Sequence, residues 1–185
     1  FLEKNNNSII IIGGRLPLYL DKKYFDNGEG GGSNNIWENK FMPTSDLKDI
    51  RITFQQSLTH LSINNKILLI YPFPEAGWDI PKKFFNSIPK NKKKIMNFFD
   101  NNEYISTSYQ VFQKRTKSSF ELLDSIRGPN IYRIYPHELL CNTLIDNRCI
   151  THDDKNIFYS DGIHPSKESS KLINNLILKQ IKKMQ

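Results

Sequence analysis

Three short runs of mostly apolar residues stand out along the chain, and the first of them is largely β-branched. They span residues 8–12, 66–71 and 131–135, and the first two end at glycine or proline. Short continuous apolar runs bounded by turn residues are typical of strands that are buried on both faces, as in parallel sheets. The sequence therefore predicts three buried central strands in a mainly parallel sheet.

Apolar residues recur every three or four positions in three other segments, which span residues 46–63, 104–126 and 165–183. This spacing predicts amphipathic helices, and residues 44–46 offer N-cap side chains to the first of them. The expected stripes of the first and last helices are Leu47, Ile50, Phe54, Leu58 and Leu61, and Leu172, Ile173, Leu176, Ile177 and Ile181. Strands that alternate with helices predict a three-layer α/β/α sandwich, with residues 1–185 as a single domain.

Three loops or connections complete the pattern. Residues 27–35 are rich in glycine and predict a flexible surface excursion, since they lack the lysine and Ser/Thr of a phosphate-binding loop. Residues 72–81 are rich in proline and leave the second strand at its C-terminal end, where a stiff loop would wall a substrate cleft. Residues 81–102 are rich in lysine and predict a surface insertion. Before the glycine-rich loop, residues 16–25 are expected to begin a helix despite Pro17.

Composition agrees with one globular domain. The chain has 185 residues, of which 38% are hydrophobic and 24% are charged. No apolar run approaches the roughly 20 residues of a membrane helix. The first residues do not form a signal peptide, and they lack an initiator Met, so we expect a fragment of a longer protein.

The formal charge of +7 raises the possibility of a nucleic-acid partner. The lysines gather at residues 90–94 and 179–183, but no recognised nucleic-acid module accompanies them. A solvated basic face is the preferred interpretation, so no nucleic acid is expected as a partner. A modest attraction to anionic surfaces or glycans remains compatible with the charge.

The two cysteines, Cys141 and Cys149, are too few for a metal site. An Asp-Asn turn between them would let two short arms face each other. A disulfide is then possible and would imply an oxidising compartment. The alternative is a pair of unbonded, buried thiols.

Candidate chemistry lies near the C-terminus, where Asp161 and His164 stand three residues apart in a short loop before the last helix. A carboxylate at that distance can accept the imidazole Nδ1–H and leave Nε2 available as a base. Gly162 lets the backbone turn, and Pro165 suits the first turn of a helix. The alternative is an ordinary helix entry, in which the two side chains only cap the helix or face solvent.

The order of four segments, residues 10–20, 67–81, 135–141 and 159–166, resembles the SGNH (GDSL-like) hydrolase superfamily. Within it, the chain is similar to the periplasmic SGNH domains fused to acyltransferase-three membrane proteins that acylate surface glycans. The most specific piece is Pro-x-Pro-Glu-x-Gly-x-Asp-x-Pro in the second segment, together with the two cysteines. The resemblance covers residues 8–182.

The resemblance implies a flavodoxin-like sandwich and a Ser-His-Asp triad, with Asp161 as the orienting carboxylate and His164 as the base. It implies an O-acyltransferase or esterase with an acyl donor, a polysaccharide acceptor, and no metal or organic cofactor. It also implies that Cys141 and Cys149 form a disulfide. The domain would lie in the periplasm, attached to an N-terminal membrane acyltransferase domain of the same inner-membrane protein. A glycan-binding module without catalysis is the alternative.

Two departures from the family pattern affect the expected site. No Gly-Asp-Ser occurs in the chain, so the nucleophile and the first one or two strands are expected upstream of residue 1. Where many relatives use Gly-x-Asn to hold the oxyanion, this chain has Gly13, Gly14 and Arg15. Arg15 or the backbone amides of this turn are therefore candidates for stabilising an oxyanion or binding substrate.

Overall fold

The computed structural model describes residues 6–21, 23–33, 46–88 and 104–184. At its centre lies a parallel sheet of β1 (Ile9–Ile12), β2 (Lys66–Ile70) and β4 (Ile131–Ile134), in the order β1-β2-β4. Both pairings in this sheet are parallel. The three predicted strands and their parallel arrangement are therefore confirmed.

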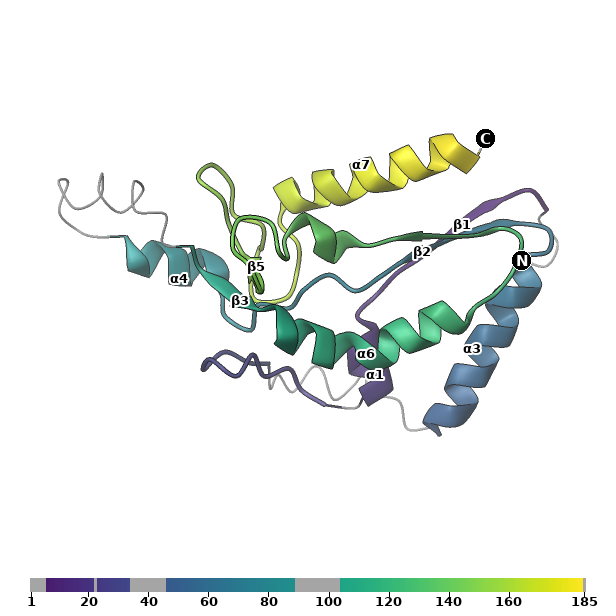
Figure 1. Cartoon of the computed structure of the whole chain (residues 1–185), viewed down its shortest axis with the longest axis horizontal. Helices are drawn as coiled ribbons and strands as arrows, with labels where there is room; N and C mark the ends of the chain where they lie inside the picture. Colours follow the sequence, from purple (N-terminus) through teal and green to yellow (C-terminus); the bar gives the residue numbers. More distant parts are fainter. Residues whose placement is uncertain (1–5, 22, 34–45, 89–103, 185) are drawn as a thin grey trace.

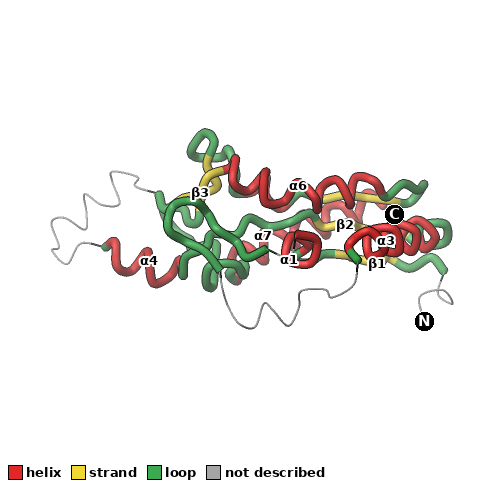
Figure 2. Tube along the Cα trace, turned by 90° about the horizontal axis from the view of Figure 1, so that it is seen from below, coloured by secondary structure: helices red, strands yellow, loops and turns green. Residues whose placement is uncertain are grey.

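Helices cover both faces of this sheet (Figure 1). One face carries α7 (Lys167–Met184), and the other carries α1 (Leu16–Asp21), α3 (Leu47–Leu61) and α6 (Tyr109–Ser125). Figure 2, turned by 90°, looks onto the layer of α1, α3 and α6. The predicted three-layer α/β/α sandwich is confirmed.

Strand β2 is the buried centre of the molecule. Its residues Ile67, Leu68 and Leu69 are fully buried, because the strand has a neighbour on each side and helices on both faces. Among the described residues, Leu69 packs toward α3 and α6, whereas Leu68 packs toward α7. This matches the period-two alternation of side chains along a strand.

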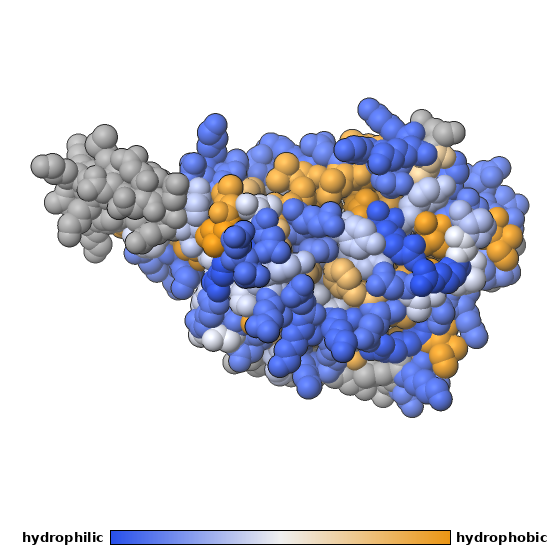
Figure 3. All heavy atoms as spheres, in the orientation of Figure 1, coloured by the Kyte–Doolittle hydropathy of each residue, from blue (hydrophilic) through white to orange (hydrophobic). Residues whose placement is uncertain are grey.

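The prediction that β1 is buried on both faces is wrong. Ile9 and Ile11 are 39% and 44% exposed, whereas Ile10 between them is buried. The reason is position: β1 lies at the edge of the sheet, and α7 packs over β2 and β4 instead. Figure 3 shows an apolar area on the α7 side of a surface that is otherwise mostly polar. Leu172 on α7, expected in the core, is 38% exposed.

The helix predicted from residue 104 begins later. Residues Ser106–Ser108 form β3, which pairs antiparallel with β5 (Arg148–Ile150) in a second, smaller sheet. The side chain of Ser108 then accepts a hydrogen bond from Val111 N at 3.3 Å and caps α6. A serine N-cap therefore separates the strand from the helix.

Within the glycine-rich loop, Asn27 and Gly31 are buried and anchor a packed turn, while residues 28–30 are exposed as the predicted surface excursion requires. Residues 34 and 35 lie outside the described residues. Asn27 is fully buried, its side-chain oxygen accepts the backbone N–H groups of Glu29 and Gly31, and its amide donates to the Ala76 carbonyl at 2.9 Å. A Cβ on Gly31 would lie 2.6 Å from the indole nitrogen of Trp78. Glycine is needed here because two segments approach closely.

Helix α4 (Ile80–Ser87) begins the lysine-rich segment, with the Asp79 side chain as its N-cap. The 3-10 helix η2 (Pro136–Leu139) follows β4. The lysine cluster at 90–94 and the predicted cap residues Thr44 and Ser45 lie outside the described residues.

The structure contains a disulfide between Cys141 and Cys149, whose Cα atoms are 3.8 Å apart in an antiparallel bridge. Both residues are buried, and Phe112 of α6 packs against them. The predicted pairing is therefore confirmed, and the bond joins β5 to the segment that follows η2.

Replacing both cysteines by alanine should lower the free energy of unfolding by about 2–3 kcal/mol, because the bond closes a short loop in the unfolded chain. Urea unfolding with and without reductant measures this. Reductant should shift the midpoint of the wild type and leave the double variant unchanged. An unshifted wild-type midpoint would contradict the prediction.

His137, in η2, is buried among the aromatic rings of Tyr109, Phe112, Phe120 and Tyr135. Its Nδ1 has no hydrogen-bond partner in the described part of the chain. Burial lowers the pKa of His137 to about 4. The folded protein therefore keeps this imidazole neutral at pH values where an exposed histidine is protonated.

Stability should consequently fall as the pH decreases from about 6.5 to about 4, because the unfolded chain binds a proton that folded His137 does not. The loss reaches about 3 kcal/mol at most. His137→Phe keeps the aromatic packing and should flatten this slope, as measured by urea unfolding at several pH values. Parallel slopes for wild type and variant would contradict the assignment to His137.

Candidate active site

The loop before α7 forms a tight hydrogen-bonded turn around one carboxylate. Oδ2 of Asp161 lies 2.6 Å from Nδ1 of His164, while Oδ1 accepts the backbone N–H groups of Ile163 at 2.7 Å and His164 at 2.8 Å. With Nδ1–H donating to the carboxylate, Nε2 is left as the basic nitrogen of the ring. This is the geometry that the sequence predicts.

The environment keeps Asp161 ionised. Partial burial acts to raise its pKa, but the hydrogen bonds from the side chain and backbone of His164 and from the backbone of Ile163 prevail, and the pKa lies below its usual range. The imidazole itself is open to solvent, with 68% of its side chain exposed. An ionised partner fixes the tautomer of the ring and would stabilise the imidazolium ion if it forms.

A cavity of about 450 Å³ lies at the C-terminal edge of the sheet, beside this pair. Its walls include Gly13 and Gly14 after β1, Ile70 at the end of β2, and His164. The glycine turn and the histidine therefore share one edge of the sheet. Open α/β sheets bind their ligands at this edge.

Arg15 lines the same cavity, but its guanidinium is already engaged. Its Nε donates to Oε1 of Glu75 at 2.6 Å, and its Nη2 contacts the same carboxylate oxygen and the Ser33 hydroxyl, the latter at 3.1 Å. Arg15 therefore belongs to an ion pair at the wall of the cavity.

Glu75 is a site residue that the sequence reasoning missed. It is 8% exposed, and its second oxygen accepts Arg115 Nε of α6 at 2.9 Å. A buried carboxylate needs such partners. The available signal was an acidic residue among apolar neighbours in a loop that leaves a buried strand, but its two partners are distant in sequence.

The proline-rich loop around Glu75 holds the Asp161–His164 turn through its backbone. Ala76 N and Gly77 N both donate to the Gly162 carbonyl, at 2.8 and 3.0 Å, and Ile80 N donates to the Asp161 carbonyl at 3.2 Å. A Cβ on Gly162 would come within 2.9 Å of the Trp78 carbonyl oxygen. The loop also lines the cavity, as the sequence predicts.

Comparison with protein families matches residues 1–179 to the SGNH domain that is fused to AT3 domains. The chain belongs to this SGNH family. Comparisons with curated proteins and with solved structures find no match. The family makes this an SGNH module of the acyltransferase or esterase type, and it associates the module with a membrane acyltransferase domain in the same chain.

No serine among the described residues of this SGNH domain bonds to His164 Nε2. Ser160 Oγ contacts the His164 carbonyl at 3.4 Å, and Ser166 Oγ accepts backbone N–H groups at the start of α7. Both flanking hydroxyls are thus engaged with backbone groups.

Two further findings concern the described part of this SGNH domain. It contains no group of three His, Cys, Asp or Glu residues that could hold a metal ion. None of its helices has the length and apolar character needed to cross a membrane.

Proposed function

We propose that this SGNH domain transfers acyl groups to, or removes them from, hydroxyls of a surface or periplasmic polysaccharide. The observation that carries the proposal is the Asp161–His164 pair, bonded at 2.6 Å, at a cavity on the C-terminal edge of the sheet. A base with a fixed tautomer beside a cavity is suited to activating a hydroxyl nucleophile.

In the proposed reaction, a serine outside these 185 residues attacks the acyl carbonyl. His164 Nε2 takes the serine proton, and Asp161 stabilises the resulting imidazolium. The tetrahedral intermediate collapses to an acyl-serine, and His164 returns the proton to the departing oxygen. A sugar hydroxyl or water then attacks the acyl-serine, again losing its proton to His164, and the serine leaves with that proton.

The turn at Gly13, Gly14 and Arg15 is the proposed site for the oxyanion or for substrate. Its residues line the same cavity as His164. A Cβ on Gly13 would lie 3.0 Å from the Ile70 Cβ, whereas nothing lies within 4 Å of the corresponding position on Gly14. The open side of Gly14 supports an approach of substrate to this backbone, where N–H groups can stabilise negative charge.

A periplasmic location is part of the proposal. The disulfide between Cys141 and Cys149 supports an oxidising compartment. The AT3 fusion of the family supports a membrane domain in the same inner-membrane protein that supplies the acyl group.

Asp161→Asn should lower kcat on the order of 10⁴-fold, by analogy with serine-protease triads, because an amide favours the wrong imidazole tautomer. Turnover of an activated acetyl ester by the full-length protein measures this. Asp146→Asn, an exposed position in the cysteine loop, is the matched control and should keep full activity. Equal turnover by the wild type and Asp161→Asn would contradict the role of Asp161, whereas no turnover by the wild type would favour the glycan-binding alternative.

A fluorophosphonate probe should label the full-length protein at a serine outside residues 1–185, since no described serine bonds to His164 Nε2. His164→Ala should slow labelling strongly, because the serine loses its base. Peptide mapping by mass spectrometry locates the adduct. A stoichiometric adduct on Ser160, Ser166 or any other serine of this chain would overturn the assignment.

A further inference from the structure

A second cavity, of about 820 Å³, opens between the segment that follows α1 and the outer face of α6. None of Asp161, His164 and Gly13 lines it. Four basic residues do: Lys23, Lys114, Arg115 and Lys117. Nothing in the proposed reaction uses this cavity.

Two of these cations are available to a ligand. Lys117 lies 3.9 Å from Glu121, one turn along α6. Lys23 and Lys114, in contrast, form no ion pair within the part of the chain that the structure describes. Two cations at one concave surface attract an anionic group.

Arg115 forms part of the wall and connects this cavity to the active site. Its Nε donates to Glu75 at 2.9 Å, and its Nη1 donates to the Lys23 carbonyl at 2.7 Å. Its Nη2 is buried and has no hydrogen-bond partner among the described residues. A donor of this kind is satisfied when an acceptor oxygen arrives.

The remaining lining distinguishes a sugar acid from other anions. Asp21 accepts a hydrogen bond from the Ser118 hydroxyl at 2.6 Å, and Asp26 accepts the Gly28 N–H at 2.8 Å, so each carboxylate retains acceptor capacity for sugar hydroxyls. Tyr24, 39% exposed, adds an aromatic surface. A polyphosphate such as nucleic acid would be repelled by these carboxylates, whereas a saccharide with one carboxylate per ring matches both signs of charge.

We propose that this cavity binds an acidic sugar unit of the polysaccharide acceptor, with its carboxylate near Lys23 and Lys114. The choice of a glycan rests on the proposed function. The two cavities lie on the two sides of one ion pair, since Glu75 lines the first and Arg115 lines the second. The second cavity is therefore a subsite for the same polymer, separate from the reacting hydroxyl.

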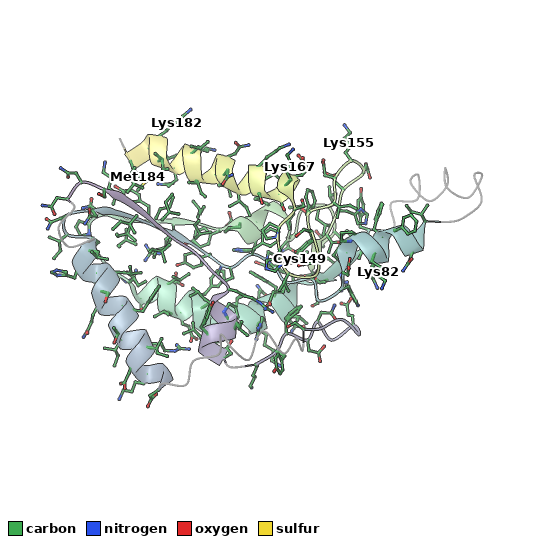
Figure 4. The ribbon with its side chains drawn as sticks, turned by 180° about the vertical axis from the view of Figure 1, so that it is seen from behind. Lys82, Cys149, Lys155, Lys167, Lys182 and Met184 are labelled. Atoms are coloured by element: carbon green, nitrogen blue, oxygen red, sulfur yellow. A yellow bond between two sulfur atoms is a disulfide. The ribbon has the colours of Figure 1, made fainter. Side chains whose placement is uncertain are left out.

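The test measures the binding of tetragalacturonate to the full-length protein by isothermal titration calorimetry. The binding of its neutral methyl ester is measured in the same way for comparison. The acidic tetramer should bind at least tenfold more tightly than the ester. Lys23→Gln combined with Lys114→Gln should weaken its binding at least tenfold. Lys182→Gln, at the far end of α7 (Figure 4), is the matched control and should bind normally.

The subsite proposal is overturned if the double variant binds tetragalacturonate as tightly as the wild type does. It is also overturned if the wild type binds the methyl ester as tightly as the acidic tetramer, or does not bind the acidic tetramer. Displacement by a DNA oligomer of equal charge at equal concentration would overturn it too. His164→Ala separates this inference from the proposed reaction, because it should abolish ester turnover and leave tetragalacturonate binding unchanged. Ester turnover that survives in His164→Ala would refute the proposed reaction and leave the subsite proposal standing.

Discussion

The structure depends on one buried carboxylate, Glu75, held between two arginines from different parts of the fold. Arg15 comes from the turn after β1, and Arg115 comes from α6. Burying a charge is unfavourable unless each of its oxygens is paired, and here both oxygens have a guanidinium partner. Breaking such a pair by removing one partner typically costs about 3–5 kcal/mol. The ion pairs therefore fix the turn, the helix and the proline-rich loop relative to one another.

The same ion pairs set the charge between the two cavities. One carboxylate and two guanidinium groups leave one net positive charge in a region that is largely removed from water. Charges in such a region are screened less by salt than charges on the open surface. An anionic group in either cavity is therefore favoured by the net charge of Glu75 and its two arginine partners.

Much of the fold could be predicted from the sequence, because its evidence is local. The run at residues 66–71 becomes a buried strand, and the pattern of residues 165–183 becomes α7. The Asp161–His164 pair was also predictable, since both partners lie within one turn. The burial of β1 was not, because it depends on which neighbours the strand meets. The glycine-rich loop and the role of Glu75 likewise depend on partners distant in sequence, namely Trp78, Arg15 and Arg115.

Forming the Asp161–His164 turn and placing it at the cavity depend on different parts of the chain. An aspartate three residues before a histidine can form these hydrogen bonds within the turn itself. Holding that turn at the cavity also requires contacts from the proline-rich loop. Gly77 adopts a φ of 80° and, with its neighbour Ala76, directs its N–H at the Gly162 carbonyl, while Glu75 anchors the loop from the other side. The constraint on position therefore lies in residues 72–81, and the chemistry lies in Asp161 and His164.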